Sequence, residues 1–197
     1  MNATATKIPD VLLLEPRVFE DSRGSFFESY NERVLAEMGI TDPFVQDNQS
    51  FSHKGVVRGL HYQIKQPQGK LIRCLRGEIY DVAVDLRRNS PTFCQWVAET
   101  LSAANHKMLW IPPGFAHGFM VLSDGAEVLY KATDFWAPQH ERTILWNDPS
   151  LEIAWPQKDR AILSVKDLAG STLDHAAVYE QPLTRQEQKT AAHAATR

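Results

Sequence analysis

Hydrophobic and polar residues alternate with a period of two along much of this chain, most clearly between residues 78 and 86. The even positions from Tyr80 to Leu86 are apolar, whereas the odd positions include the charged Asp81 and Asp85. Successive side chains of a β-strand point to opposite faces of its sheet. The pattern therefore predicts a strand with one face on a hydrophobic core.

Nine further short runs have a strand-like composition, and turn signals separate them. These runs cover residues 25–30, 44–52, 56–63, 70–76, 93–101, 106–111, 117–122, 127–133 and 151–155. The turn signals include Arg-Gly at 23–24, Pro-Pro-Gly at 112–114 and Asn-Asp-Pro at 147–149. Many short strands with regular turns predict an all-β protein, either a sandwich or a barrel.

Helical periodicity is scarce. Residues 31–38 can form about two turns, with Asn31 as the N-cap and Gly39 just past the end. A second helical stretch is predicted over residues 167–179. We expect one domain over residues 1–182, followed by a loosely attached, polar and alanine-rich tail over residues 183–197.

Composition narrows the function classes. Of the 197 residues, 43% are hydrophobic and 23% are charged, as in an ordinary globular protein. The 21 Lys and Arg residues face 24 Asp and Glu residues, and this net charge of -3 argues against a nucleic-acid partner. The aliphatic run at 11–14 is far shorter than the roughly 20 residues of a membrane span or the roughly 7–15 of a signal peptide. We expect a soluble, cytoplasmic protein that binds no membrane.

The chain has two cysteines, Cys74 and Cys94, and no C-x-x-C pair. Two cysteines cannot form a disulfide framework. Both lie in strand-like runs, so we interpret them as thiols that fill space in the core.

Candidate chemistry begins with the run Arg-Gly-Leu-His-Tyr-Gln at residues 58–63. On a strand, His61 shares a face with Gly59 and Gln63, and the glycine leaves room beside the imidazole. The Pro-Pro-Gly turn delivers a second histidine, His117, into a strand near a barrel mouth. Lys70 starts another strand, and Tyr130 lies on a later one.

These residue types suit proton transfer without a cofactor. An imidazole accepts a proton near neutral pH, whereas a tyrosine, with a pKa of about 10, holds its proton and can donate it to a carbanion or enolate. A lysine or second histidine can stabilise the oxyanion that develops. A base and an acid on opposite walls of a pocket would invert a carbon next to a carbonyl.

The arrangement of strand, proline-glycine turn and histidine is similar to that of the cupin barrel. Metal-binding cupins start their site with His-x-His, but here Gln63 stands where the second histidine would be. A glutamine amide is a poor ligand for a transition metal. We therefore predict no metal site, while a metal-dependent cupin and a non-catalytic cupin that binds sugar nucleotides remain alternatives.

Nine motifs in a fixed order resemble the dTDP-4-dehydrorhamnose 3,5-epimerase family of cupin enzymes. They lie at residues 19–28, 46–50, 57–63, 68–71, 90–93, 112–119, 130–134, 146–149 and 163–167, so the resemblance covers most of the chain. It implies an all-β fold, a cupin or jelly-roll barrel with a few short helices. It also implies an isomerase that uses no cofactor and acts on a dTDP-4-keto-6-deoxy sugar.

The resemblance assigns roles to individual residues. It implies that His61 is the base, that Tyr130 is the acid on the opposite face, that Asp167 orients and charges His61, and that Lys70 stabilises the enolate oxygen at C4. The implied substrate-binding residues are Arg23, Phe26, Glu28, Gln46, Asp47, Asn48, Arg58, His117, Trp136, Glu141 and Lys166. Arg23 and Glu28 are implied to reach into the site of a partner subunit, so a homodimer is expected.

One position departs from the family pattern. Phe135-Trp136 stands where the family has a pair of tyrosines, so that Trp136 keeps an aromatic face, loses a hydroxyl and is larger. This departure leaves open a second hypothesis, in which the chain inverts only C3 or only C5 of a dTDP-4-ketosugar in another deoxysugar pathway.

Overall fold

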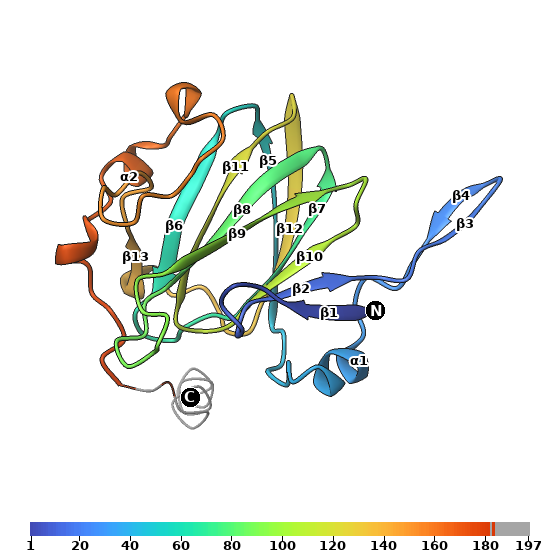
Figure 1. Ribbon diagram of the computed structural model, residues 1–197, viewed down its shortest axis with the longest axis horizontal. Helices are drawn as coiled ribbons and strands as arrows, with labels where there is room; N and C mark the ends of the chain where they lie inside the picture. Colours follow the sequence, from blue (N-terminus) through green and yellow to red (C-terminus); the bar gives the residue numbers. More distant parts are fainter. Residues whose placement is uncertain (182, 184–197) are drawn as a thin grey trace.

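The computed structural model describes residues 1–181 and 183, and they form two antiparallel sheets that face each other (Figure 1). One sheet has the strand order β1 (Asn2–Ala5), β2 (Leu12–Glu15), β10 (Met108–Ile111), β7 (Lys70–Arg76), β12 (Gly125–Ala132) and β5 (Gln46–His53). The other has the order β13 (Glu141–Thr143), β6 (Val57–Gln63), β11 (Phe115–Val121), β8 (Glu78–Asp85) and β9 (Trp96–Ser102). This architecture confirms the predicted all-β jelly roll.

The main core fills the space between the two sheets. Ile72 and Val128 from the first sheet pack there against Ile79, Ala83 and Phe119 from the second. Cys74 belongs to this cluster, whereas Cys94 is only partly buried, and both thiols are free. The core closes one part of the barrel and leaves room for a cavity in the other.

The prediction of a single core face for residues 78–86 was wrong, because both faces of β8 are buried. Ile79 and Ala83 point into the barrel, while Val82 and Val84 lie under a second apolar cluster on the outside of the sheet. The segment after β13 supplies the cover. The cover includes Trp146, Leu151, Ile153, Trp155, Val178 and Tyr179. Asp81 and Asp85, which the alternation places on a polar face, are fully buried.

Most predicted strands occur within a few residues of their expected bounds, but two predictions near the C-terminus were wrong. Residues 151–155 alternate between buried and exposed, as a strand would, yet they form none, and Glu152 has a positive φ of 50°. The predicted helix at 167–179 is only the short α2 (Val165–Leu168) and the 3₁₀ turn η3 (Leu173–His175). The side chains of these segments pack on the outer apolar cluster, and the backbone forms neither a strand ladder nor a continuous helix.

The helix predicted at 31–38 is confirmed as α1 (Glu32–Glu37). The Asn31 side chain caps it by accepting hydrogen bonds from the backbone N–H groups of Arg33 and Val34. Gly39 follows its end with a φ of 86°, a conformation that favours glycine. Leu35 of this helix packs on the outer face of the six-stranded sheet.

A two-stranded hairpin, β3 (Phe19–Asp21) and β4 (Gly24–Phe26), projects away from the barrel (Figure 1). All residues of both strands are exposed. The Phe27 ring anchors the base of the hairpin, where it lies 4.7 Å from the His106 ring and 4.7 Å from the Arg73 guanidinium.

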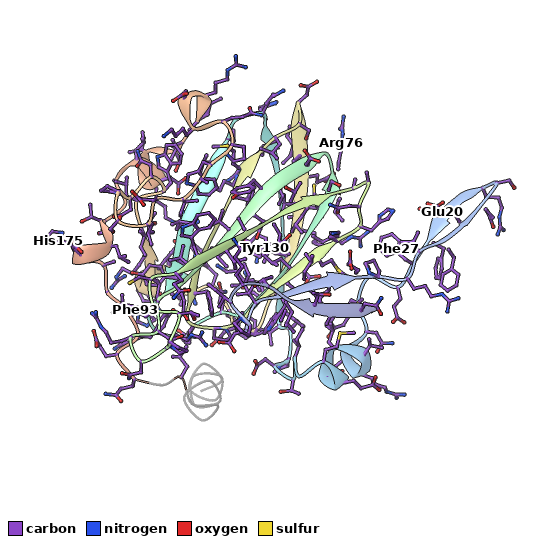
Figure 2. All side chains as sticks on the ribbon, viewed as in Figure 1. Glu20, Phe27, Arg76, Phe93, Tyr130 and His175 are labelled. Carbon is purple, nitrogen blue, oxygen red and sulfur yellow. The ribbon has the colours of Figure 1, made fainter. Side chains whose placement is uncertain are left out.

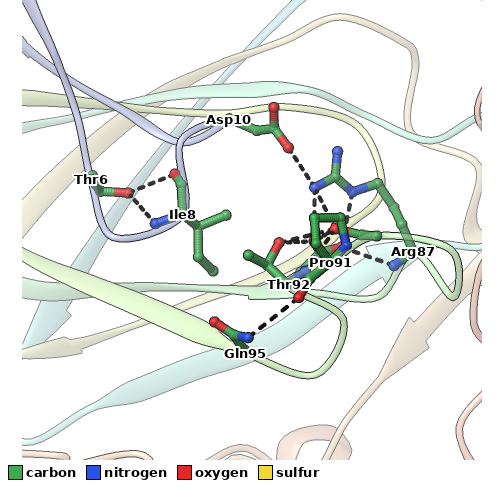
Figure 3. Close-up of polar contacts among 9 residues, drawn as sticks. Thr6, Ile8, Asp10, Arg87, Pro91, Thr92 and Gln95 are labelled. Atoms are coloured by element: carbon green, nitrogen blue, oxygen red, sulfur yellow. Dashed lines mark hydrogen bonds and ion pairs between the residues drawn. The ribbon is translucent and has the colours of Figure 1, made fainter.

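A polar network fixes the turn between β8 and β9 (Figure 3). The buried Asp85 carboxylate accepts hydrogen bonds from the guanidinium of Arg87 and from the hydroxyls of Ser90 and Thr92. Arg87 also reaches Asp10 in the β1–β2 loop at 2.7 Å, so the network ties two distant loops together.

Two further short 3₁₀ turns are η1 (Pro138–His140) and η2 (Lys158–Arg160). None of the helices in the described residues has the length and hydrophobicity of a membrane span. The predicted tail lies outside the described residues apart from Leu183, and the domain bounds stay a prediction.

Candidate active site

A cavity of about 380 Å³ opens between the two sheets. Side chains from both sheets line it together with three loop or helix residues. The lining residues are Gln46, Asn48, Gln49, Ser50, Arg58, His61, Tyr62, Gln63, Gln68, Lys70, His117, Phe119, Tyr130, Trp136, Glu141 and Lys166. The lining is rich in titratable groups, which is unusual for the interior of a small barrel and typical of a site that moves protons.

His61 on β6 is paired with Asp167 on α2. His61 Nε2 donates a hydrogen bond to Asp167 Oδ1 at 2.5 Å, and the Ser164 hydroxyl donates to Oδ2 at 2.7 Å. Asp167 is only 3% exposed. Burial by itself would raise the pKa of Asp167, but the bonds from His61 and Ser164 outweigh it and hold that pKa below its usual value.

The pairing leaves Nδ1 of His61 without a hydrogen-bond partner among the residues described. An ionised carboxylate on one ring nitrogen stabilises the imidazolium that forms when the other nitrogen takes a proton. The dyad therefore has the chemistry of a general base at the wall of the cavity.

Lys70 begins β7, and its side chain is buried in the cavity wall. Burial lowers the pKa of Lys70 to about 8, although the carboxylates of Glu141 and Asp81 act in the opposite direction. The Lys70 ammonium contacts the backbone carbonyl of His61 at 3.4 Å. A cation in this position, next to the base, can stabilise the negative charge that develops on a substrate oxygen.

Tyr130 lies on β12, in the sheet opposite to that of His61, and points into the barrel (Figure 2). Burial raises the pKa of its hydroxyl, which therefore stays protonated at neutral pH. A base and a proton donor thus face one cavity from two different sheets.

A second histidine–carboxylate pair lies deeper in the wall. His117 Nε2 donates to both oxygens of Asp81, at 2.9 and 3.1 Å, and both residues are buried. The His117 ring lies 6.5 Å from the Tyr130 ring, measured between centroids. Asp81 was missed in the sequence; a carboxylate between the apolar residues of a strand that is buried on both faces is the signal that could have found it.

Positive charge gathers at the rim of the cavity. Arg58 lines it and donates from Nε to the Ser52 hydroxyl at 2.9 Å, and Lys166 pairs with Glu141 at 2.7 Å. Together with Lys70, these side chains suit an anionic ligand such as a nucleotide diphosphate.

Comparison with known proteins settles the family. A model of the family described as dTDP-4-dehydrorhamnose 3,5-epimerase matches residues 5–175. The chain belongs to the dTDP-4-dehydrorhamnose 3,5-epimerase family. This confirms the resemblance seen in the motifs, and the family is one of isomerases.

Individual relatives agree along most of their length. The dTDP-4-dehydrorhamnose 3,5-epimerase of Pseudomonas aeruginosa is 64% identical over 171 residues, which are 86% of this chain and 94% of that protein. The enzyme of the same name from Salmonella typhimurium is 56% identical, over 89% of this chain and 97% of its own. A crystal structure of the Legionella pneumophila epimerase in complex with dTDP-4-keto-L-rhamnose has a TM-score of 0.89 and 47% identity, and the match covers 92% and 99% of the two chains.

Most of the site residues predicted from the sequence lie around the epimerase cavity. Those that line it are Gln46, Asn48, Arg58, His61, Lys70, His117, Tyr130, Trp136, Glu141 and Lys166, and Asp167 joins through His61. Gln49, Ser50, Tyr62, Gln63, Gln68 and Phe119 also line it and were missed as site residues. Several of them stand inside the nominated motifs, next to the residues that were named. The roles of all these residues stay predictions.

Four nominated residues lie elsewhere in the single chain. Asp47 points away from Gln46 and Asn48 on β5 and pairs with Lys131 at 2.9 Å. Arg23 and Phe26 are on the projecting hairpin, where Arg23 pairs with Asp21 at 2.6 Å. Glu28, just beyond it, accepts a hydrogen bond from the Asn31 amide. None of the four lines the cavity of its own chain.

Three or more His, Cys, Asp or Glu side chains grouped so that they could hold a metal ion are not found in the described part of the chain. The Gln63 amide bonds to backbone groups of the protein. Metal independence stays a prediction that chelation can test.

Proposed function

We propose that this chain epimerises C3 and C5 of dTDP-4-dehydro-6-deoxy-D-glucose and so forms dTDP-4-dehydro-L-rhamnose in dTDP-L-rhamnose biosynthesis. The observation that supports it most directly is the placement of His61 and Tyr130 on opposite sheets across one cavity. The names of the relatives agree with this reaction. The cationic rim suits the diphosphate of the substrate.

The reaction starts with proton removal. His61 Nδ1 takes the proton from the carbon beside the C4 ketone, and the electron pair of the broken C–H bond forms a C=C bond while the carbonyl pair moves to oxygen. Asp167 stabilises the imidazolium, and the Lys70 ammonium stabilises the enolate oxygen.

Proton return completes the inversion. Tyr130 donates its proton to the same carbon from the opposite face, a new C–H bond forms, and the electron pair on oxygen restores the ketone. His61 then releases its proton to solvent and Tyr130 takes one up from solvent, and the same two steps at the second carbon give the doubly inverted sugar. The C4 ketone of the substrate acidifies both C–H bonds, so the scheme requires no organic cofactor.

We also propose a homodimer in which the hairpin enters the partner's site. Phe26 is 73% exposed on the hairpin, and every residue of both hairpin strands is exposed. Insertion of Arg23, Phe26 and Glu28 into the second copy would bury that surface and complete a cavity that one chain leaves open. The cytoplasmic location remains a prediction from the sequence.

Proton NMR of the substrate in heavy water tests the proposal. The expected result is incorporation of deuterium at both C3 and C5, together with formation of the L-sugar. Exchange at one carbon only would favour the alternative single-carbon epimerase, which the Trp136 substitution motivates. No exchange at either carbon would contradict both.

A further inference from the structure

One short segment at the cavity mouth, residues 134–137, leaves the strand ladder and still has an ordered set of backbone contacts. Strand β12 ends at Ala132, and the side chains of Phe135 and Trp136 are 54% and 58% exposed. Asp134 and Ala137 on either side are buried, so the exposed part is the Phe135-Trp136 pair, whose side chains gain little from hydrophobic burial although Trp136 lines the cavity.

Glutamine side chains hold the segment in place. Gln63 accepts a hydrogen bond from the Ala137 N–H at 2.8 Å and donates to the Phe135 carbonyl at 3.2 Å. Gln46 accepts from the Trp136 N–H at 2.9 Å, and Gln68 donates to the Asp134 carbonyl at 2.8 Å. The three glutamines come from β5, from β6 and from the loop that follows β6.

Gln63 is the central member of this set because it bonds on both sides of Trp136. It is 3% exposed, and its amide also donates to the Gln66 carbonyl at 2.7 Å, so both N–H groups and the oxygen have protein partners. Its backbone is fixed as well, since its carbonyl accepts from the Tyr179 hydroxyl and β6 pairs with β13 at this residue. A rigid residue thus fixes two backbone groups on either side of the exposed Trp136 side chain.

We propose that Gln63 is a positioning residue for substrate binding, which acts through the backbone of residues 135 and 137 to hold Trp136 as a wall of the cavity. This inference rests on the proposed function for the identity of the substrate. A freed segment would adopt conformations in which the indole leaves the cavity, and the binding-competent fraction of the protein would fall. The apparent Kd of a ligand then rises in inverse proportion to that fraction, whereas the chemistry at His61 is unchanged.

The test is a double-mutant cycle on the full chain with Gln63→Met and Trp136→Ala. Gln63→Met keeps the length of the side chain and removes its hydrogen bonds. We expect about a tenfold rise in KM for dTDP-4-keto-6-deoxyglucose with kcat changed less than about threefold, because net hydrogen bonds of this kind each contribute modestly and uniform binding appears in KM. In the Trp136→Ala background, the same change should alter KM less than about twofold.

Two controls keep the result interpretable. Gln95→Met makes the same chemical change at an exposed residue that does not line the cavity and should leave KM unchanged; its amide donates a long hydrogen bond of 3.5 Å to the Pro91 carbonyl. If Gln63→Met does not fold, as judged by circular dichroism, Gln63→Asn keeps an amide but withdraws it by one methylene, and the same cycle applies.

An unchanged KM in the Gln63 variant, or an equal rise with and without Trp136, would overturn the proposal. These outcomes are separate from failure of the proposed function. That failure would show as a wild-type chain with no turnover of the same substrate and no calorimetric binding of dTDP, and it would remove the basis of this inference too.

Discussion

Two regions of the molecule bury an aspartate beside a basic side chain, and they differ in what the partner can do. At the β8–β9 turn, Asp85 bonds to Arg87, whose guanidinium keeps its charge at any physiological pH. In the cavity, Asp167 bonds to His61, an imidazole that can gain and lose a proton. Burial alone would raise the pKa of both carboxyls, yet their hydrogen bonds hold both pKa values below the usual range.

The Asp85 ion pair is structural because both oxygens of its carboxylate are bound to other groups of the protein. Asp85 uses its oxygens on Arg87, Ser90 and Thr92, and Arg87 is further bound to Asp10. Such a closed set holds loops together and leaves no group free to react. The His61–Asp167 pair leaves one ring nitrogen for a substrate, so the same kind of contact supports chemistry instead.

The largest effect should come from His61→Asn, which removes the proton acceptor and keeps the approximate size. Catalytic turnover should fall by roughly 10²–10⁴-fold or more, while the melting temperature should change little because an asparagine amide can still donate a hydrogen bond to the buried Asp167. The measurement is the rate of deuterium wash-in at C3. His175→Asn, at an exposed histidine on η3, is the matched control and should keep full activity. Near-normal exchange in the His61 variant would exclude His61 as the base.

Arg87→Met should lower stability and keep activity, because it leaves the buried Asp85 without its cation. We expect a loss of roughly 3–5 kcal/mol in the free energy of unfolding, because removing one partner strands a buried charge. Activity per folded molecule should persist, since Arg87 does not line the cavity. Urea titration measures the loss. Arg88→Met, which breaks an exposed pair with Glu180, should cost less than about 1 kcal/mol. Equal losses in the two variants would contradict the structural role of the Asp85 network.

Tyr130→Phe separates the two halves of the reaction. Net epimerisation should fall by roughly 10²-fold, because the opposite-face proton donor is gone, while His61 still removes protons. Solvent deuterium should then enter at least one position faster than inversion occurs. Tyr80→Phe, on the outer face of the other sheet, is the control and should leave both rates alone. If exchange and inversion fell by one factor at both carbons, Tyr130 would not be a dedicated acid.

The pH dependence follows from Lys70, whose pKa burial lowers to about 8. Below that pH the side chain is a cation, and above it the charge that stabilises the enolate is lost. We therefore expect kcat/KM to fall as pH rises through about 8, with a limit of about tenfold for each further pH unit. Lys70→Arg keeps the charge and should move this decline to higher pH. An unchanged alkaline limb in Lys70→Arg would assign the decline to another group.

The smallest effect is expected from metal removal. Exhaustive chelation should leave the rate unchanged, since the proposed steps use only His61, Tyr130, Lys70 and Asp167. Metal analysis of the purified protein should find no stoichiometric transition metal. Activity that returns only when a divalent ion is added would support the metal-dependent alternative.

Features that depend on neighbouring residues could be predicted from the sequence alone. Alternation located the long strands β5 to β8, and the capping chemistry of Asn31 located α1, because pleat periodicity and helix caps are local properties. Ordered motifs also identified the family and most residues that line the cavity. Short strands such as β1 and β13 escaped notice, since their residues carry no clear period and they exist through the strands they pair with.

Contacts between residues far apart in the sequence depend on the tertiary fold and could not be predicted from local patterns. His61 and Asp167 are 106 positions apart, and no local pattern states that α2 brings the carboxylate to β6. Asp81 shares the inward face of β8 with Ile79 and Ala83, so it becomes the partner of His117 inside the barrel instead of a solvated charge, while the outer apolar cluster covers the opposite face. At residues 151–155 the same cluster imposes alternating burial without a ladder. Alternating hydrophobic and polar residues indicate alternating burial. Such a segment is a β-strand only when its backbone also forms hydrogen bonds to a neighbouring strand.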